Sequence, residues 1–129
     1  MSLLETERID GCPVVRIRED IDAANAAIVQ QQLAAAIEGA SSLVVDLSET
    51  GYLDSAGIDM LLRLSVLLDN RRAKLILVIP ASSQIRRLAE IVGLPNALPV
   101  YEGISEALQS VLPRRTSVVV PDGTGSSEA

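Results

Sequence analysis

Residues 43–68, LVVDLSETGYLDSAGIDMLLRLSVLL, decide the fold that this chain can adopt. Residues 43–47 are a short apolar block with polar flanks, which is typical of a strand buried on both faces. A tight bend at Gly51 follows, and an apolar helical pattern then runs over residues 56–70. The stretch therefore predicts a strand, a turn and a helix in succession.

Ser55 lies at the junction of this turn and this helix. We expect it at the N-cap, where its hydroxyl oxygen would accept from unpaired N–H groups of the first turn. A phosphoryl group at this helix start would meet the positive end of the helix dipole. Several carboxylates would repel it: Asp20, Asp22, Asp54 and Asp59. The fold should therefore tolerate phosphorylation of Ser55 while the surface around it changes strongly.

Strands and helices alternate along the rest of the chain. The dipeptide Asp10-Gly11 between two patterned segments predicts an antiparallel hairpin over residues 3–17. Asp22 is the expected N-cap of an alanine-rich helix that ends at Gly39. Further strands are expected at residues 74–79 and 98–101, and further helices at about residues 84–92 and 104–112.

This alternation predicts a single α/β domain over residues 1–112. Its sheet should be mostly parallel but mixed, with about five strands, about four helices and the antiparallel hairpin at the N-terminal end. Residues 113–129 are rich in Pro, Gly, Ser and Thr and carry no strand or helix period beyond three valines. They are expected to form a disordered C-terminal tail.

Composition excludes several classes of function. The net charge is −6 and only two residues are aromatic, both Tyr, which argues against a nucleic-acid partner. No apolar run approaches the length of about 20 residues that a membrane span needs, and no signal peptide is visible. The single cysteine, Cys12, cannot form an internal disulfide and is expected to be structural. We therefore expect a cytoplasmic protein without a membrane partner.

Catalysis and metal binding are both weakly supported. The chain has no histidine, so no imidazole is available to activate Ser55, and residues 53–57 lack the first glycine of the G-x-S-x-G nucleophile turn. There is no phosphate-binding loop of the G-x-x-x-x-G-K-[ST] type. Asp20, Asp22 and Asp54 could collect a divalent cation, but capping and solvation explain them better. The chain is expected to be neither an enzyme nor a cofactor-binding protein.

The segment VVDLSETGYLDSAGIDMLLRL resembles the signature of STAS domains of bacterial anti-sigma factor antagonists, in which D-L-S is followed by D-S-[ST/A]-G and an apolar helix. The similarity extends from the acidic turn at residues 19–22 to the final helix, so that it covers about residues 3–112. Ala56 departs from the second hydroxyl residue that is common after the serine. Asp59 replaces a glycine often found two residues after Gly57, which puts a charge on the docking face and leaves the partner's identity open.

This resemblance implies an anti-sigma factor antagonist that works as a phosphorylation switch. Unphosphorylated, it would bind an anti-sigma factor that is itself a serine kinase; phosphorylation of Ser55 would release it, and a phosphatase would reset it. ATP and Mg²⁺ would belong to the kinase. Asp22 matches the acidic residue beside the serine. The residues expected to contact the partner are Asp22, Asp54, Ser55, Ala56, Gly57, Asp59, Met60 and Arg63.

Two other functions fit the same resemblance. A STAS domain can also be a scaffold that does not switch, within a signalling or transporter complex, in which case Ser55 only caps its helix. A sensor of small ligands would instead require an apolar pocket near Tyr52.

Overall fold

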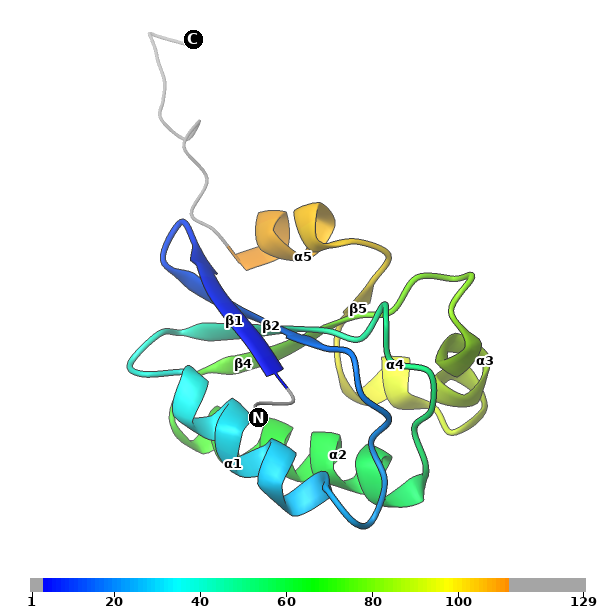
Figure 1. Ribbon diagram of the computed structural model, residues 1–129. Coiled ribbons are helices and arrows are strands. Elements are labelled where there is room, and N and C mark those ends of the chain that lie inside the picture. Colours follow the sequence, from blue (N-terminus) through cyan, green and yellow to red (C-terminus); the bar gives the residue numbers. More distant parts are fainter. Residues whose placement is uncertain (1–3, 112–129) are drawn as a thin grey trace, which may run out of the picture.

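Five strands form one mixed sheet in the computed structural model, which describes residues 4–111 (Figure 1). They are β1 (Leu4–Ile9), β2 (Cys12–Ile17), β3 (Ser42–Asp46), β4 (Lys74–Val78) and β5 (Val100–Tyr101). Their order in the sheet follows the chain, β1-β2-β3-β4-β5; β1 pairs antiparallel with β2, and every other pairing is parallel. The predicted α/β fold with its N-terminal hairpin is confirmed.

The hairpin turn has the geometry that its sequence predicts. Asp10 has φ 50° and Gly11 has φ 83°, and these positive values match the right-handed twist of the two strands they join. The turn pairs Ile9 with Cys12 and places β1 at an edge of the sheet.

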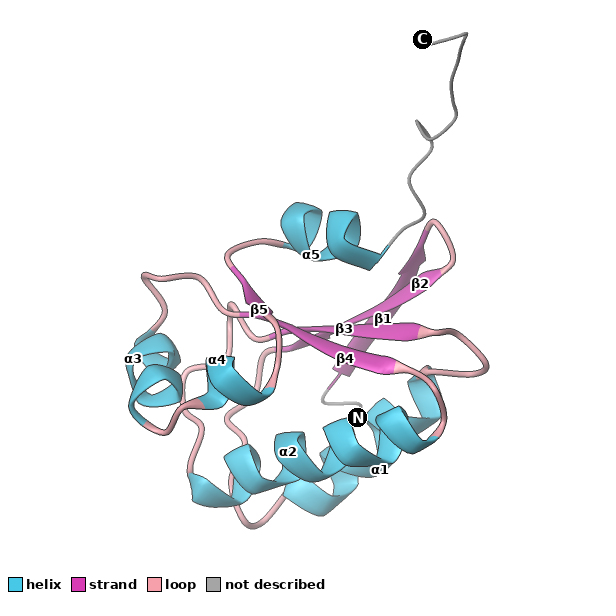
Figure 2. Ribbon diagram, turned by 180° about the vertical axis from the view of Figure 1, so that it is seen from behind, coloured by secondary structure: helices cyan, strands magenta, loops and turns pink. Residues whose placement is uncertain are grey.

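Helices cover both faces of the sheet (Figures 1 and 2). Helices α1 (Ala26–Ala36) and α2 (Ser55–Asn70) lie side by side on one face, and α5 (Ile104–Val111) lies on the other. Helices α3 (Gln84–Ile91) and α4 (Leu94–Ala97) follow β4. No helix within residues 4–111 is long and apolar enough to cross a membrane.

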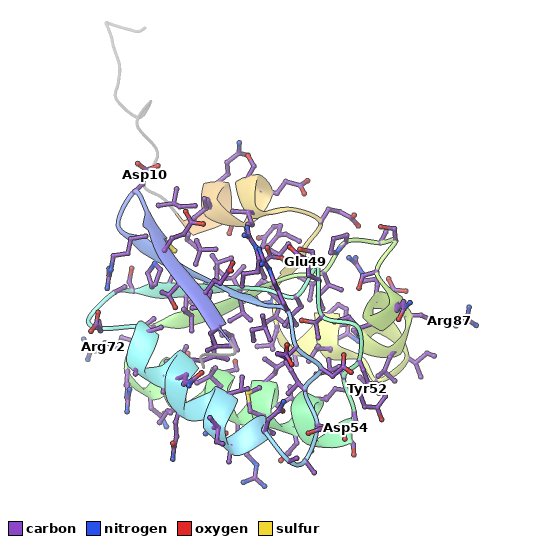
Figure 3. All side chains as sticks on the ribbon, in the orientation of Figure 1. Asp10, Glu49, Tyr52, Asp54, Arg72 and Arg87 are labelled. Carbon is purple, nitrogen blue, oxygen red and sulfur yellow. The ribbon has the colours of Figure 1, made fainter. Side chains whose placement is uncertain are left out.

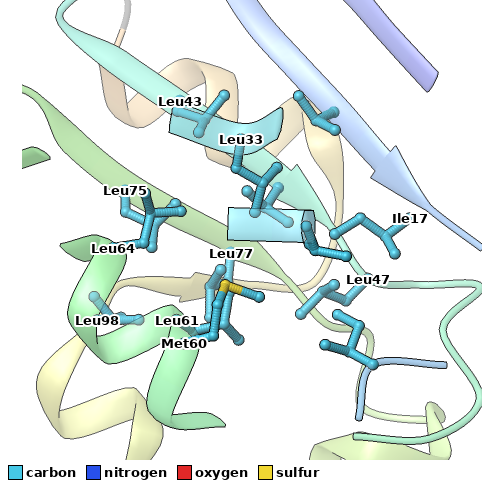
Figure 4. Close-up of a cluster of buried hydrophobic side chains, with 14 of the residues drawn as sticks. Ile17, Leu33, Leu43, Leu47, Met60, Leu61, Leu64, Leu75, Leu77 and Leu98 are labelled. Carbon is cyan, nitrogen blue, oxygen red and sulfur yellow. The ribbon is translucent and has the colours of Figure 1, made fainter. Parts of the chain in front are cut away.

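Strand β3 is buried on both faces, as its apolar run predicts. Leu43 and Val45 pack with the larger core cluster under α1 and α2, whereas Val44 packs with the smaller cluster under α5. Figure 4 shows the larger cluster, in which aliphatic side chains of the sheet meet those of α1 and α2. The low aromatic content is therefore compatible with a continuous core.

Some boundaries differ from the prediction. Helix α4 was not expected. It follows Gly93, whose φ is 77°, and has Pro95 in its first turn. The N–H groups of a first turn have no partner within the helix, so proline, which lacks an N–H, removes no helical hydrogen bond there. The helix expected at about residues 84–92 is α3, which begins at Gln84 and ends at Ile91, so that Val92 is its C-cap. The expected tail, residues 113–129, lies outside the described residues.

Candidate functional site

Ser55 is the first residue of α2 and not its N-cap, so the prediction of its capping role was wrong. The N-cap is Asp54, whose backbone is extended and whose Oδ1 accepts from the Gly57 N–H at 3.1 Å. Ser55 is exposed. Because a neighbouring carboxylate already caps the helix, the Ser55 hydroxyl is available to other chemistry.

The loop before Ser55 is tied to the loop before α1. Ile21 and Leu53 form a parallel bridge, in which the Ile21 N–H donates to the Tyr52 carbonyl at 3.0 Å and the Asp54 N–H donates to the Ile21 carbonyl at 3.3 Å. Both Ile21 and Leu53 are fully buried. This pairing brings the Asp22 segment beside the start of α2, as the sequence resemblance implies.

Asp22 organises its own loop rather than capping α1. Its Oδ1 accepts from the N–H groups of Ala24 at 2.9 Å and Asn25 at 3.3 Å, and the N-cap of α1 is Asn25. The predicted N-cap was therefore wrong, because one further turn separates Asp22 from the helix. Asp20, Asp22 and Asp54 do not form a metal-ligand group within residues 4–111.

Gly57 allows the two loops to approach each other. A Cβ atom at this position would lie 2.5 Å from Leu53 Cδ1 and 3.1 Å from both Cγ2 and the carbonyl oxygen of Ile21. One of these contacts is with backbone, which cannot rotate away as a side chain can. A residue without a side chain is therefore needed where α2 passes the Ile21–Leu53 bridge.

Gly57→Ala is expected to lower the free energy of unfolding by about 1 to 3 kcal/mol, the range for overpacking in a well-packed region. Urea unfolding followed by circular dichroism measures this loss. Gly103→Ala is the matched control, because its added Cβ would meet only Glu106 Oε1, at 4.0 Å. Equal stabilities of the two variants would contradict the proposed close approach.

The outer face of α2 carries polar side chains, although the sequence pattern of this helix is apolar on most sides. Asp59 and Arg63 are exposed and form an ion pair one helical turn apart, with Oδ2 and Nε at 2.7 Å. Ala56 is half-buried. Met60, by contrast, was expected to contact a partner but is only 3% exposed and belongs to the core cluster. Met60 and Gly57 are therefore buried beneath the outer face of α2 and are not exposed to a partner.

An ion pair missed by the sequence interpretation holds the start of the loop after β3. Asp46 is 2% exposed. Its Oδ2 accepts from Arg16 Nε at 3.2 Å, and its Oδ1 accepts from the Ser48 N–H at 3.0 Å and from the Ser48 hydroxyl at 2.5 Å. The guanidinium of Arg16 donates a hydrogen bond to Asp46, and this bond raises the pKa of Arg16 above its usual value. The parallel register pairs Arg16 with Asp46, which sequence patterns alone do not reveal.

The middle of the same loop is fixed by Thr50. This residue is buried, and its hydroxyl donates to the Ile17 carbonyl at 2.6 Å. The loop between β3 and α2 is therefore anchored at three points: by Asp46, by Thr50 and by the Ile21–Leu53 bridge. Figure 3 shows Tyr52 and Asp54 on this loop, at the same corner of the molecule.

The sequence pattern of the STAS domain matches residues 4–107. This chain belongs to the STAS domain family. The matched region includes all five strands, the Ser55 loop and α2, and so it contains the whole candidate site.

Relatives and solved structures of similar fold agree with this assignment. BtrV of Bordetella bronchiseptica, named for an anti-sigma factor antagonist role, is 29% identical over 115 residues, which are 86% of this chain and 98% of BtrV. An anti-sigma factor antagonist from Mycobacterium paratuberculosis has a crystal structure that matches with a TM-score of 0.70 and 26% identity, over 84% of this chain and 92% of that one. SpoIIAA of Bacillus in its phosphorylated form matches with a TM-score of 0.61 at 20% identity, over 84% and 99% of the two chains, and it shows the fold alone.

Tyr52 of this STAS domain does not line the hollow that its neighbour Gly51 lines. That hollow, of about 310 Å³, lies between the Ser48–Gly51 turn and the start of α3, and its lining is mainly polar: Ser48, Glu49, Thr50, Gly51, Pro80, Ser82, Ser83 and Gln84. Tyr52 is instead 53% exposed. An apolar ligand pocket formed by Tyr52 therefore has no support in the described residues.

Cys12 of the STAS domain lies in the smaller core cluster and is 6% exposed. Burial raises the pKa of its thiol, which the positive charge of Arg8 lowers to a lesser extent. The neutral thiol is thus favoured, and the residue is poorly suited to act as a nucleophile.

Proposed function

We propose that this STAS domain is an anti-sigma factor antagonist whose binding to an anti-sigma factor serine kinase is switched by phosphorylation of Ser55. The observation that carries the proposal is the exposed position of Ser55 on the first turn of α2, where Asp54 and not Ser55 caps the helix. The names of BtrV and of the mycobacterial antagonist support the same role. In this proposal the chain is the substrate of a kinase and has no catalytic activity of its own.

The hydrogen bonding of the helix start keeps an added phosphate at the surface. The Gly57 N–H already donates a hydrogen bond to Asp54, so it is not available to bind a phosphate on Ser55. Arg63, on the same face, is already paired with Asp59. A phosphate on Ser55 would therefore add about two negative charges that these neighbouring groups leave largely uncompensated.

The partner would dock on the corner formed by the Asp22 loop and the outer face of α2. Its contact residues in this proposal are Asp22, Asp54, Ser55, Ala56, Asp59 and Arg63. Docking would remove water from Ser55, and desolvating a phosphate next to carboxylates costs several kcal/mol. Phosphorylation therefore opposes binding, and removal of the phosphate by a phosphatase restores it.

A phosphorylation assay tests the modified residue. The purified protein is incubated with radiolabelled ATP and, one at a time, with the anti-sigma factor kinases of the source organism, and phosphate incorporation is measured. We expect incorporation of one phosphate by the wild type and none by Ser55→Ala. The matched control is Ser105→Ala, because Ser105 is also exposed and also lies in the first turn of a helix, α5. Undiminished incorporation by Ser55→Ala would refute the assignment.

A further inference from the structure

Strand β4 leaves part of one backbone edge open at its start. Successive residues of a strand direct their N–H and carbonyl groups to opposite edges. The Lys74 N–H donates to the Ser41 carbonyl, next to β3. The Leu77 N–H donates to the Pro99 carbonyl, next to β5. Leu75, two residues before Leu77, therefore directs its own N–H and carbonyl groups to the β5 side.

Within residues 4–111, no strand residue pairs with Leu75 on that side. Strand β5 begins only at Val100, and Pro99, the residue before it, has no N–H to donate. The described part of the chain forms no hydrogen bond there with the N–H or the carbonyl of Leu75. Backbone groups are costly to withdraw from water without a partner, so this edge suits an occupant that brings one donor and one acceptor.

A hollow of about 340 Å³ lies at this open edge. Its walls come from α2, from the start of β4 and from the segment that leads into β5, and they include Val66, Asp69, Lys74, Leu75, Leu98 and Pro99. The volume is at the lower end of the range of about 300 to 1,000 Å³ that is typical of small-molecule sites. Asp69 lies near the end of α2 and Ser55 at its start, about 21 Å apart at a rise of about 1.5 Å per residue. The hollow is therefore separate from the Ser55 site.

The walls of this hollow carry one charge of each sign. Asp69 and Lys74 both line it, and both are exposed. Neither side chain forms an ion pair or a hydrogen bond with any described residue, and so they do not pair with each other. Two opposite charges that share a hollow without contact are complementary to a small ligand that carries both charges.

We propose that this hollow binds a free amino acid with an apolar side chain, which pairs with Leu75 as a residue of a neighbouring strand would. In an antiparallel pair, two opposed residues exchange both of their N–H···O bonds. A free amino acid carries the same donor and acceptor on one α-carbon. Its ammonium group donates to the Leu75 carbonyl, and its carboxylate accepts from the Leu75 N–H, so that one small molecule satisfies both open groups.

The charges of the hollow agree with this orientation of the ligand. The Leu75 N–H belongs to the peptide bond that joins Leu75 to Lys74, so a carboxylate bonded to it lies next to Lys74. The ammonium group carries the charge that Asp69 attracts. The reverse orientation would direct the carboxylate at the Leu75 carbonyl, where two acceptors would repel each other.

The walls of the hollow favour an aliphatic side chain on the ligand. Val66 is 62% exposed although it is aliphatic, and it lines the hollow together with Leu98 and Pro99. An aliphatic ligand side chain would remove part of this apolar surface from water, which is favourable. Leucine therefore matches the site better than an acidic or a basic amino acid does.

Titration of the full chain with L-leucine, followed by NMR of the ¹⁵N-labelled protein, tests the site. We expect saturable shifts of the amide signals of Leu75 and Val66, and no shift at Ser55, because it lies at the other end of α2. N-acetyl-L-leucine amide keeps the side chain but carries neither charge, and its Kd should be at least about tenfold higher.

Variants of the two charged residues test the orientation. Asp69→Asn and Lys74→Gln should each raise the Kd for L-leucine at least about tenfold, because each removes one of the charges that the ligand meets. The matched controls are Asp59→Asn and Arg71→Gln, which remove exposed charges outside the hollow and should keep the Kd within about twofold of the wild type.

Three results would overturn the inference. The first is the absence of a saturable shift at Leu75 with L-leucine. The second is an equal Kd for L-leucine and its uncharged derivative, and the third is an unchanged Kd in both Asp69→Asn and Lys74→Gln. None of these measurements uses a kinase or a change at Ser55, so the proposed switch is tested separately.

Discussion

Ser55→Asp is expected to weaken binding to the anti-sigma factor at least about a hundredfold, because a charge desolvated beside Asp54 and Asp22 costs roughly 3 kcal/mol. Isothermal titration calorimetry with the purified partner measures the change. The loss should arise mainly from the desolvation of a fixed charge and not from altered shape, since Asp54 continues to cap α2 in the variant. Its circular dichroism spectrum and melting temperature should therefore stay close to those of the wild type.

Ser105→Asp provides the matched control for this experiment. It adds the same charge in the first turn of α5, which lies on the opposite face of the sheet from α2. We expect binding within about twofold of the wild type, because an exposed charge outside the interface is largely screened. If Ser55→Asp also binds like the wild type, the switch is refuted and a scaffold role without switching is favoured.

Asp46→Ala is expected to lower the free energy of unfolding by about 2 to 3 kcal/mol, since a buried carboxylate that accepts three hydrogen bonds is lost and its donors are left unsatisfied. Urea unfolding measures the loss. Because Asp46 fixes Ser48 at the start of the loop, hydrogen exchange in residues 48–54 should increase as well.

Glu5→Ala is the control for Asp46→Ala. Glu5 also pairs with Arg16, at 3.8 Å, and with Arg18, at 3.2 Å, but its side chain is 57% exposed. Exposed ion pairs contribute less than about 1 kcal/mol. A comparable loss in the two variants would show that burial of Asp46 is not what makes its interactions important.

The strands, helices and turns that could be predicted are those that a local pattern of residues identifies without knowledge of tertiary contacts. Residues 43–45 and 75–79 are continuous apolar runs, and the structure buries strands β3 and β4 there. The hairpin followed from Asp10-Gly11, since few other dipeptides tolerate two positive φ angles. Helix α4 escaped prediction, because a helix of four residues is too short to show a period.

The candidate site was harder to predict at the level of single residues. Asp54 and Ser55 are both good N-caps, and only the extended backbone of Asp54 shows which of them fills the position. Met60 lies on a helix that is apolar on most sides, so the pattern could not tell a core residue from a docking residue. Arg16 and Asp46 are 30 positions apart and meet only through the parallel register of β2 and β3. The role of Ser55 as phosphoacceptor stays a prediction.

The anchored loop before Ser55 determines what a kinase would have to recognise. Kinases often bind their substrates as flexible, extended peptides, but here Thr50 is bonded to β2 and the Ile21–Leu53 bridge joins two segments far apart in the sequence. A short peptide with the sequence of residues 48–60 would lose every one of these restraints, and Asp22 with them. If Ser55 is the phosphoacceptor, as we propose, we expect the kinase to recognise a folded surface and not a linear motif, so that only correctly folded molecules would be phosphorylated.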